Sequence, residues 1–133
     1  MKLKEKPTTC IQEQDIRKKT AAFLITEDRR LFLLDDYSIP ESIVEEGESH
    51  QSTLEQIVSS LGINPENLRL LCYSSNIDDD SKEVKDYAVY TGKIKNDIFK
   101  THSLGRIRQL QGEGHLRGFD SVITYLAKTN QVQ

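Results

Sequence analysis

The fold of this chain depends most on the stretch from Ser38 to Ile63, which reads S-I-P-E-S-I-V-E-E-G-E-S-H-Q-S-T-L-E-Q-I-V-S-S-L-G-I. Pro40 favours an extended backbone at the residue before it, and Gly47 permits a tight turn. Ser49 follows at a position where its hydroxyl can accept a hydrogen bond from a free N–H group at the start of a helix. The stretch therefore predicts a short strand around Ile43 and Val44, a tight loop and then a helix.

The helix is predicted by its apolar spacing and by a clear stop signal. Four aliphatic residues recur at i, i+3, i+4 and i+7, as one face of an amphipathic helix requires: Leu54, Ile57, Val58 and Leu61. Gly62 is well placed to end this helix in a left-handed conformation, and Pro65 follows soon after. This is the best-defined element of the sequence.

Upstream of this stretch, two apolar runs flank a charged turn. Arg17 to Thr26 and Arg30 to Asp35 each have the composition of a buried strand, and Glu27 to Arg29 separates them. Two such runs around a short polar turn predict an antiparallel hairpin.

Downstream, Leu68 to Tyr73 and Val84 to Ile94 are predicted strands, joined by an acidic loop from Ser74 to Glu83. In the second of these strands, Tyr87 and Tyr90 would point to opposite faces of a sheet.

The C-terminal part of the chain gives one ambiguous segment and one clear helix. Ser103 to Leu110 fits either a strand or a helical turn. Phe119 to Lys128 places its apolar residues on one helix face. Mixed strands with a central and a C-terminal helix predict an α/β sandwich.

Length, charge and cysteine content restrict the class of protein. The 133 residues fit one domain, from residue 16 to 133, preceded by a polar arm of residues 1–15. A net charge of −3 gives no general attraction to nucleic acid or anionic membranes, and no apolar run could span a bilayer. Two cysteines, Cys10 and Cys72, indicate a reducing compartment, although one disulfide is compatible with the sequence. We therefore expect a cytoplasmic protein that does not bind nucleic acid.

The segments S-I-P, V-E-E-G-E-S and L-G-I, together with the order of the predicted elements, resemble the Nudix hydrolase family. The usual motif of that family is G-x5-E-x7-R-E-U-x-E-E-x-G-U, where U is a bulky aliphatic residue. The resemblance covers roughly Lys18 to Lys128. It implies an α/β (α+β) class and an α/β/α sandwich with a mixed β-sheet. It also implies an ancestral metal-dependent hydrolysis of nucleoside diphosphate-linked compounds.

The residues that would perform this chemistry differ from the motif. The paired glycines after the proline are replaced by Glu41 and Ser42, and the spacing between Glu48 and Gly62 is one residue too short. Counted back from Gly62, the R-E-U-x-E-E positions are Glu55, Gln56, Ile57, Val58, Ser59 and Ser60. Counted forward from Glu48, they are Gln56, Ile57, Val58, Ser59, Ser60 and Leu61. Neither register has a carboxylate at any of the three metal-binding positions.

This loss has a direct chemical consequence. Carboxylates at i, i+3 and i+4 of a helix form one anionic patch, and Mg²⁺ binds through carboxylates and substrate phosphates. An amide or a hydroxyl has no negative charge to replace them. We therefore predict that metal-dependent hydrolysis is lost and that no cofactor is required. The chain would then bind a nucleotide, another phosphate-bearing small molecule, or a protein partner.

Two alternatives stay open. A divergent hydrolase would use Glu45, Glu48 and Glu113 with Mg²⁺ or Mn²⁺, whereas a purely structural interaction protein would have a filled cleft. The candidates for binding a ligand are Arg106, Arg108 and His115, which belong to a locally basic segment. The acidic residues of the loop 78–83 lack the spacing of a calcium-binding loop, and we expect them to be solvated.

Overall fold

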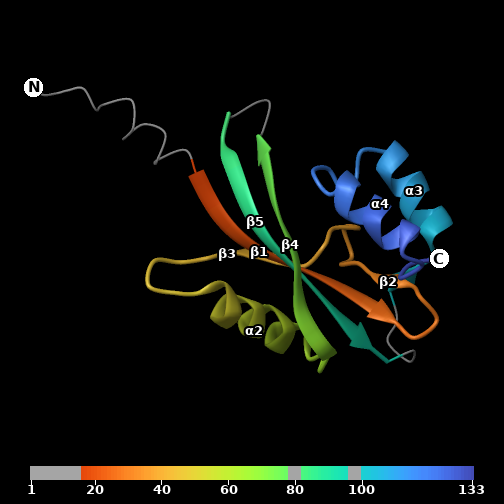
Figure 1. The fold of residues 1–133 in the computed structure, drawn as a ribbon, viewed down its shortest axis with the longest axis horizontal. Coiled ribbons are helices and arrows are strands. Elements are labelled where there is room, and N and C mark those ends of the chain that lie inside the picture. Colours follow the sequence, from red (N-terminus) through yellow and green to blue (C-terminus); the bar gives the residue numbers. More distant parts are fainter. Residues whose placement is uncertain (1–15, 78–81, 96–99) are drawn as a thin grey trace, which may run out of the picture.

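The computed structural model describes residues 16–77, 82–95 and 100–133. The predicted arm of residues 1–15 and the aspartates of the acidic loop lie outside these residues. The elements in chain order are β1 (Ile16–Thr26), β2 (Leu31–Phe32), β3 (Glu41–Ile43), α2 (His50–Leu61), β4 (Glu66–Ile77), β5 (Val84–Ile94), β6 (Thr101–His102), α3 (Leu104–Gly112) and α4 (Asp120–Lys128). Figure 1 shows their arrangement.

The centre of the molecule is a six-stranded mixed sheet. Its strand order is β4-β5-β1-β2-β6, and β3 pairs separately with β1. The β1 and β5 strands run parallel over their whole lengths, whereas the other pairs are antiparallel. The predicted mixed sheet is confirmed.

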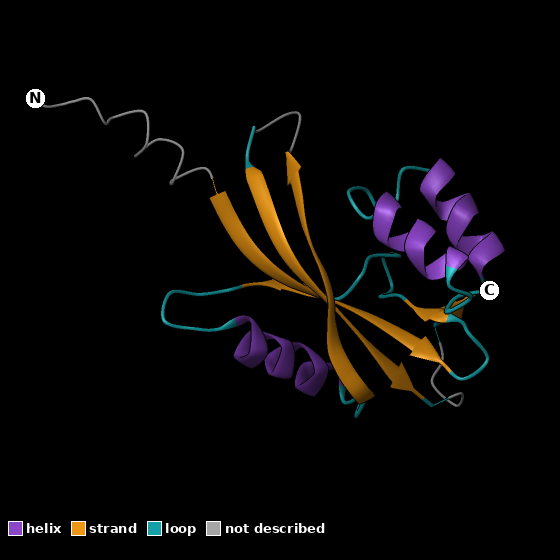
Figure 2. Cartoon of the chain, viewed as in Figure 1, coloured by secondary structure: helices purple, strands orange, loops and turns teal. Residues whose placement is uncertain are grey.

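Both faces of the sheet are covered, which explains the unbroken apolar run in β1. Phe23 and its neighbours at alternate positions belong to a core cluster with residues of α3 and α4. Leu24 and its neighbours belong to a second cluster with Leu54 and Ile57 of α2. A strand buried on both faces has no polar alternation. The helices therefore form two outer layers, on opposite sides of the sheet, as Figure 2 shows.

The α2 helix has both predicted end signals. The Ser52 N–H donates to Ser49 Oγ at 3.0 Å, and the Ser49 N–H donates to Ser52 Oγ at 3.1 Å, which completes a reciprocal capping box. At the other end Gly62 has a φ of 69°. The Ile63 N–H donates to the Val58 carbonyl at 3.4 Å and the Gly62 N–H to the Ser59 carbonyl at 3.1 Å, which is a Schellman arrangement.

Several predicted boundaries are corrected. The strand predicted for Arg30–Asp35 is only Leu31–Phe32, because the Leu33 N–H donates to the Lys100 carbonyl (3.1 Å) and the chain leaves the hairpin ladder. The short strand expected at Ile43 and Val44 lies slightly earlier, at Glu41–Ile43. The β4 strand includes Ser74–Ile77, where the sequence predicts a loop.

The ambiguous segment near the C-terminus is helical. The α3 helix begins after Ser103, whose hydroxyl accepts a hydrogen bond from the Arg106 N–H at 3.3 Å. The clear helix prediction is confirmed as α4. Tyr87 and Tyr90 lie against opposite core clusters, as predicted. Among the helices of the described residues, none is long and apolar enough to cross a membrane.

Candidate functional site

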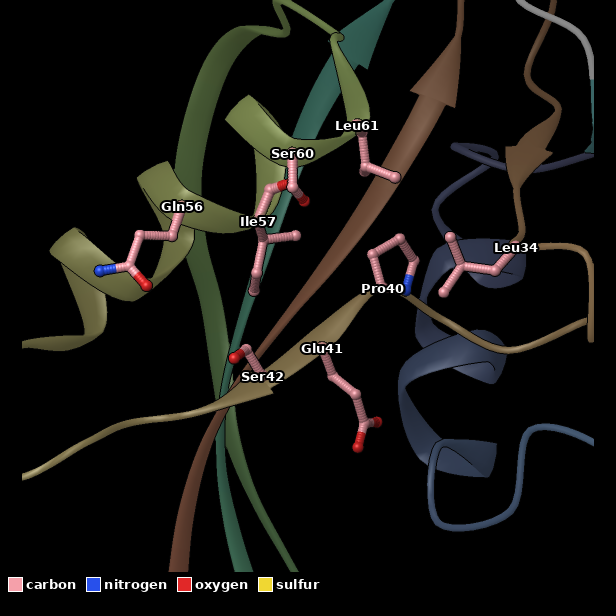
Figure 3. A pocket seen from close by; sticks show the side chains of 8 residues that line it. All are labelled: Leu34, Pro40, Glu41, Ser42, Gln56, Ile57, Ser60 and Leu61. Carbon is pink, nitrogen blue, oxygen red and sulfur yellow. The ribbon is translucent and has the colours of Figure 1, made fainter.

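A cleft of about 380 Å³ separates α2 from β3 and from the loop that precedes β3. Its walls are partly apolar and partly polar; eight residues line it (Figure 3): Leu34, Pro40, Glu41, Ser42, Gln56, Ile57, Ser60 and Leu61. Glu41 and Ser42 come from β3, Pro40 directly precedes that strand, and the α2 residues come from the C-terminal half of the helix. Apart from Leu34, the residues that line the cleft therefore belong to the stretch 38–63.

The α2 residues at the metal-binding positions of the motif lie at this cleft or beside it. Gln56 and Ser60 line the cleft, and Ser59 joins them at an adjoining shallow depression. All three are exposed, whereas Ile57 is only 6% exposed and packs into the core. A buried Ile57 could not present a ligand to solvent, so the register counted back from Gly62 describes the exposed face of α2.

The donors on this face do not fit a hard divalent cation. They consist of one amide and two hydroxyls, and the Ser60 hydroxyl already donates to the Ile57 carbonyl at 2.8 Å. Mg²⁺ binds through charged carboxylates, which these positions lack. Glu55, at the arginine position of the motif, accepts a hydrogen bond from Gln51 Nε2 at 3.4 Å.

The three carboxylates of the hydrolase alternative have separate surroundings. Glu48 Oε1 accepts hydrogen bonds from Ser52 Oγ at 2.9 Å and from Gln56 Nε2 at 3.0 Å, so this carboxylate is held at the start of α2. Glu45 is exposed in the preceding loop, and Glu113 is exposed at the C-terminal end of α3. Within residues 16–77, 82–95 and 100–133, no three His, Cys, Asp or Glu side chains form a potential metal-binding group.

Glu41 belongs to a polar cluster that sequence reasoning missed. Its Oε1 atom lies 2.8 Å from Lys19 Nζ, and its two carboxylate oxygens lie 3.2 and 3.3 Å from the Tyr87 hydroxyl. Burial raises the pKa of Tyr87, and the charge of Glu41 raises it further. Because the hydroxyl therefore stays protonated, it can donate to Glu41. This cluster places a carboxylate, neutralised by a lysine, at the position of a motif glycine.

The basic candidates near the C-terminus are only partly brought together. Arg106 Cζ lies 5.3 Å from the centre of the Tyr37 ring, and the His115 ring lies 5.3 Å from the same ring, centre to centre. The His102 ring also contacts Tyr37, at 5.9 Å. Arg108 is not part of this cluster and donates to Gln111 Oε1 at 3.0 Å.

Tyr37, which contacts this basic cluster, belongs to a loop that also contributes residues to the cleft. It lies in the loop whose residues Leu34 and Pro40 line the cleft, and its φ of 63° is unusual for a bulky residue. Burial lowers the pKa of His102, and the charges of Arg106 and Arg30 lower it further. Tyr37 was not singled out in the sequence, because nothing local indicates that two histidines and an arginine surround it.

Comparison with solved structures identifies the fold. A Nudix hydrolase from Nitrosomonas europaea superposes with a TM-score of 0.59 and 15% identity, over 87% of this chain and 90% of that chain. A MutT structure from work on Aliivibrio salmonicida and Vibrio cholerae gives a TM-score of 0.56 and 14% identity, over 81% of this chain and 92% of that chain. The Nudix domain of Shewanella oneidensis NrtR, solved with ADP-ribose, gives a TM-score of 0.54 and 16% identity, over 69% of this chain and 75% of that chain.

These similarities establish a Nudix-like fold for the chain, as the sequence predicted. At these identities they establish the fold alone. No protein-family model and no curated protein matches the sequence.

Proposed function

We propose that this chain is a Nudix-fold binding module that holds a nucleotide or another phosphate-bearing small molecule in the cleft between α2 and β3, without metal-dependent hydrolysis. The observation that carries the proposal is the combination of an open cleft with neutral side chains at the metal-binding positions. A cavity of about 380 Å³ falls within the usual range for small-molecule sites. Gln56 and Ser60 offer hydrogen bonds there but no charge for a cation.

The chemistry around the cleft supports a ligand with both apolar and polar parts. Leu34, Pro40 and Leu61 supply apolar wall on which a flat ring could pack. Ser42, Gln56 and Ser60 supply polar groups in the same cleft. Arg106, held against Tyr37, belongs to the α3 side of the sheet and does not line the cleft. The solved complex of the NrtR Nudix domain with ADP-ribose provides a ligand of this kind as a first probe.

The hydrolase alternative rests on the hydrolases among the structural neighbours and on Glu45, Glu48 and Glu113. It predicts turnover of nucleoside diphosphate derivatives with Mg²⁺ or Mn²⁺ that depends on these carboxylates. Turnover by the wild-type protein that disappears in Glu48→Gln would establish this alternative and overturn ours.

The binding proposal is tested by blocking the cleft. ADP-ribose should raise the melting temperature of the wild-type protein, because a ligand of the native state stabilises it. Ser60→Tyr places a ring in the cleft and should abolish this shift. Ser59→Tyr is the matched control, since Ser59 is exposed and does not line the cleft; it should keep the shift.

Two results would contradict the proposal. If no nucleotide or sugar phosphate stabilised the wild-type protein, the filled-cleft or protein-partner interpretation would be favoured. If Ser60→Tyr kept the full shift, the ligand would bind elsewhere.

A further inference from the structure

A second cavity, of about 450 Å³, lies at the end of the sheet where β1 and β5 finish and β4 begins. It shares no lining residue with the cleft beside α2. In Figure 1 the arrowheads of β1 and β5 mark this end of the sheet. The cavity is lined by three cationic side chains, Arg29, Arg69 and Lys93, and by one carboxylate, Glu27.

Strand register explains why two of these cations lie together. Arg69 is directly opposite Thr91, and Thr91 is opposite Phe23. Directly opposite residues in neighbouring strands share one face of a sheet, and Lys93 shares it too because it lies two residues beyond Thr91. Phe23 belongs to the core cluster covered by α3 and α4. Arg69 and Lys93 therefore project on the α4 side of the sheet.

The segment that follows α4 forms one wall of the cavity. Arg69 Nη2 lies 3.4 Å from Gln131 Oε1, which links β4 to this segment. Three residues that line the cavity have left-handed backbones: Arg29 (φ 66°) after β1, Asn67 (φ 57°) at the irregular start of β4, and Asn130 (φ 58°) after α4. Such conformations cost energy and gather where a structure holds a particular local geometry. Part of the wall is therefore built from backbone in an uncommon conformation.

The charge of this cavity is opposite to that of the whole chain. Three cations and one carboxylate give it a formal charge of +2, whereas the chain carries −3. Clustered cations repel one another, and an anion between them removes that repulsion. The arginine guanidinium matches a phosphate group with two parallel hydrogen bonds. The side-chain amides of Asn67, Asn130 and Gln131 add both donors and acceptors around the cations.

We propose that this second cavity binds a phosphomonoester of a small polyhydroxy compound, with the phosphate between Arg29, Arg69 and Lys93 and the hydroxyls on the amides. The cavity has the volume of a small-molecule site and is larger than a phosphate group alone needs. This proposal is independent of the function assigned to the α2 cleft.

The experiment is a titration of the ¹⁵N-labelled full chain with inorganic phosphate and with glucose 6-phosphate, followed by amide chemical shifts at constant ionic strength. Saturable shifts are expected at residues 26–29, 67–69, 91–93 and 130–131, with glucose 6-phosphate binding more tightly than phosphate. Glucose and chloride should give none. Arg69→Gln and Lys93→Gln should each raise the Kd roughly tenfold, as the loss of one charge-assisted hydrogen bond predicts.

Lys18→Gln is the matched control, because Lys18 is an exposed lysine near the start of β1, at the opposite end of that strand. It should leave the Kd unchanged. Circular dichroism melts establish that each variant is folded; both Arg69 and Lys93 are exposed. The proposal is overturned if the shifts do not saturate, if both substitutions leave the Kd unchanged, or if the saturable shifts map to the α2 cleft. The last result would leave the proposed function intact.

Discussion

The two faces of α2 differ in which features of the Nudix motif they keep. The inward face carries Leu54 and Ile57 into the core, and both helix ends have complete capping interactions. The outward face presents Gln56, Ser59 and Ser60, which are neutral where the Nudix motif has carboxylates. Packing and capping are therefore sufficient to hold this loop and helix in place. The fold does not require the carboxylates that would make the outward face bind a metal.

The largest effect should come from the inward face. Leu54→Ala removes a side chain that is only 1% exposed and should lower the free energy of unfolding by about 2–5 kcal/mol, because it leaves a cavity in the core. Ser59→Ala, on the outward face, should change that free energy by no more than about 0.5 kcal/mol. Urea denaturation measures both. Similar losses in the two variants would remove the distinction between the faces.

The helix stop should have a smaller effect. Gly62→Ala forces a left-handed backbone (φ 69°) on a residue with a Cβ and should cost about 1–2 kcal/mol. The added Cβ would meet no atom within 4 Å, so the cost comes from the backbone alone. Gly105→Ala in α3 is the control: its Cβ would meet only Ser103 Oγ, at 3.9 Å. It should stabilise the protein by up to about 1 kcal/mol, because alanine favours a helix. If Gly62→Ala left the free energy of unfolding unchanged in the same denaturation experiment, Gly62 would not act as the cap of this helix.

The smallest effect is a pH dependence in the cluster around Tyr37. The pKa of His102 is lowered in the folded state, so between that value and the unfolded pKa of about 6.5 the unfolded chain binds more protons. This contribution to stability is present above pH 6.5 and is lost as the pH falls toward the folded-state pKa. Denaturation midpoints at pH 7.5, 6 and 5 should therefore fall more steeply for wild type than for His102→Gln. Identical slopes would show that His102 is not responsible.

The sequence predicted the elements whose signals are local. The α2 helix is predicted by Ser49, the aliphatic stripe and Gly62, which lie within one short stretch. Each of these signals affects only the residues next to it in the sequence. The α3 helix was ambiguous because it is short, contains Gly105 and Gly112, and buries only Ile107 and Leu110.

Features that depend on long-range pairing could not be predicted. The contact of Glu41 with Lys19 and Tyr87 exists because β3 and β5 both pair with β1, on its two sides. No local pattern encodes that register. The second cavity likewise combines ends of β1, β4 and β5 with the segment after α4.

The most direct test of the central claim is a Mn²⁺ titration of the wild-type protein and of the triple variant Gln56→Glu, Ser59→Glu, Ser60→Glu, measured by calorimetry. We expect no saturable Mn²⁺ binding by the wild type at millimolar metal. We expect one site in the triple variant, because three carboxylates then share the exposed face of α2 with Glu48. Tight Mn²⁺ binding by the wild type that is lost in Glu48→Gln would contradict the loss of the metal site and favour the hydrolase alternative.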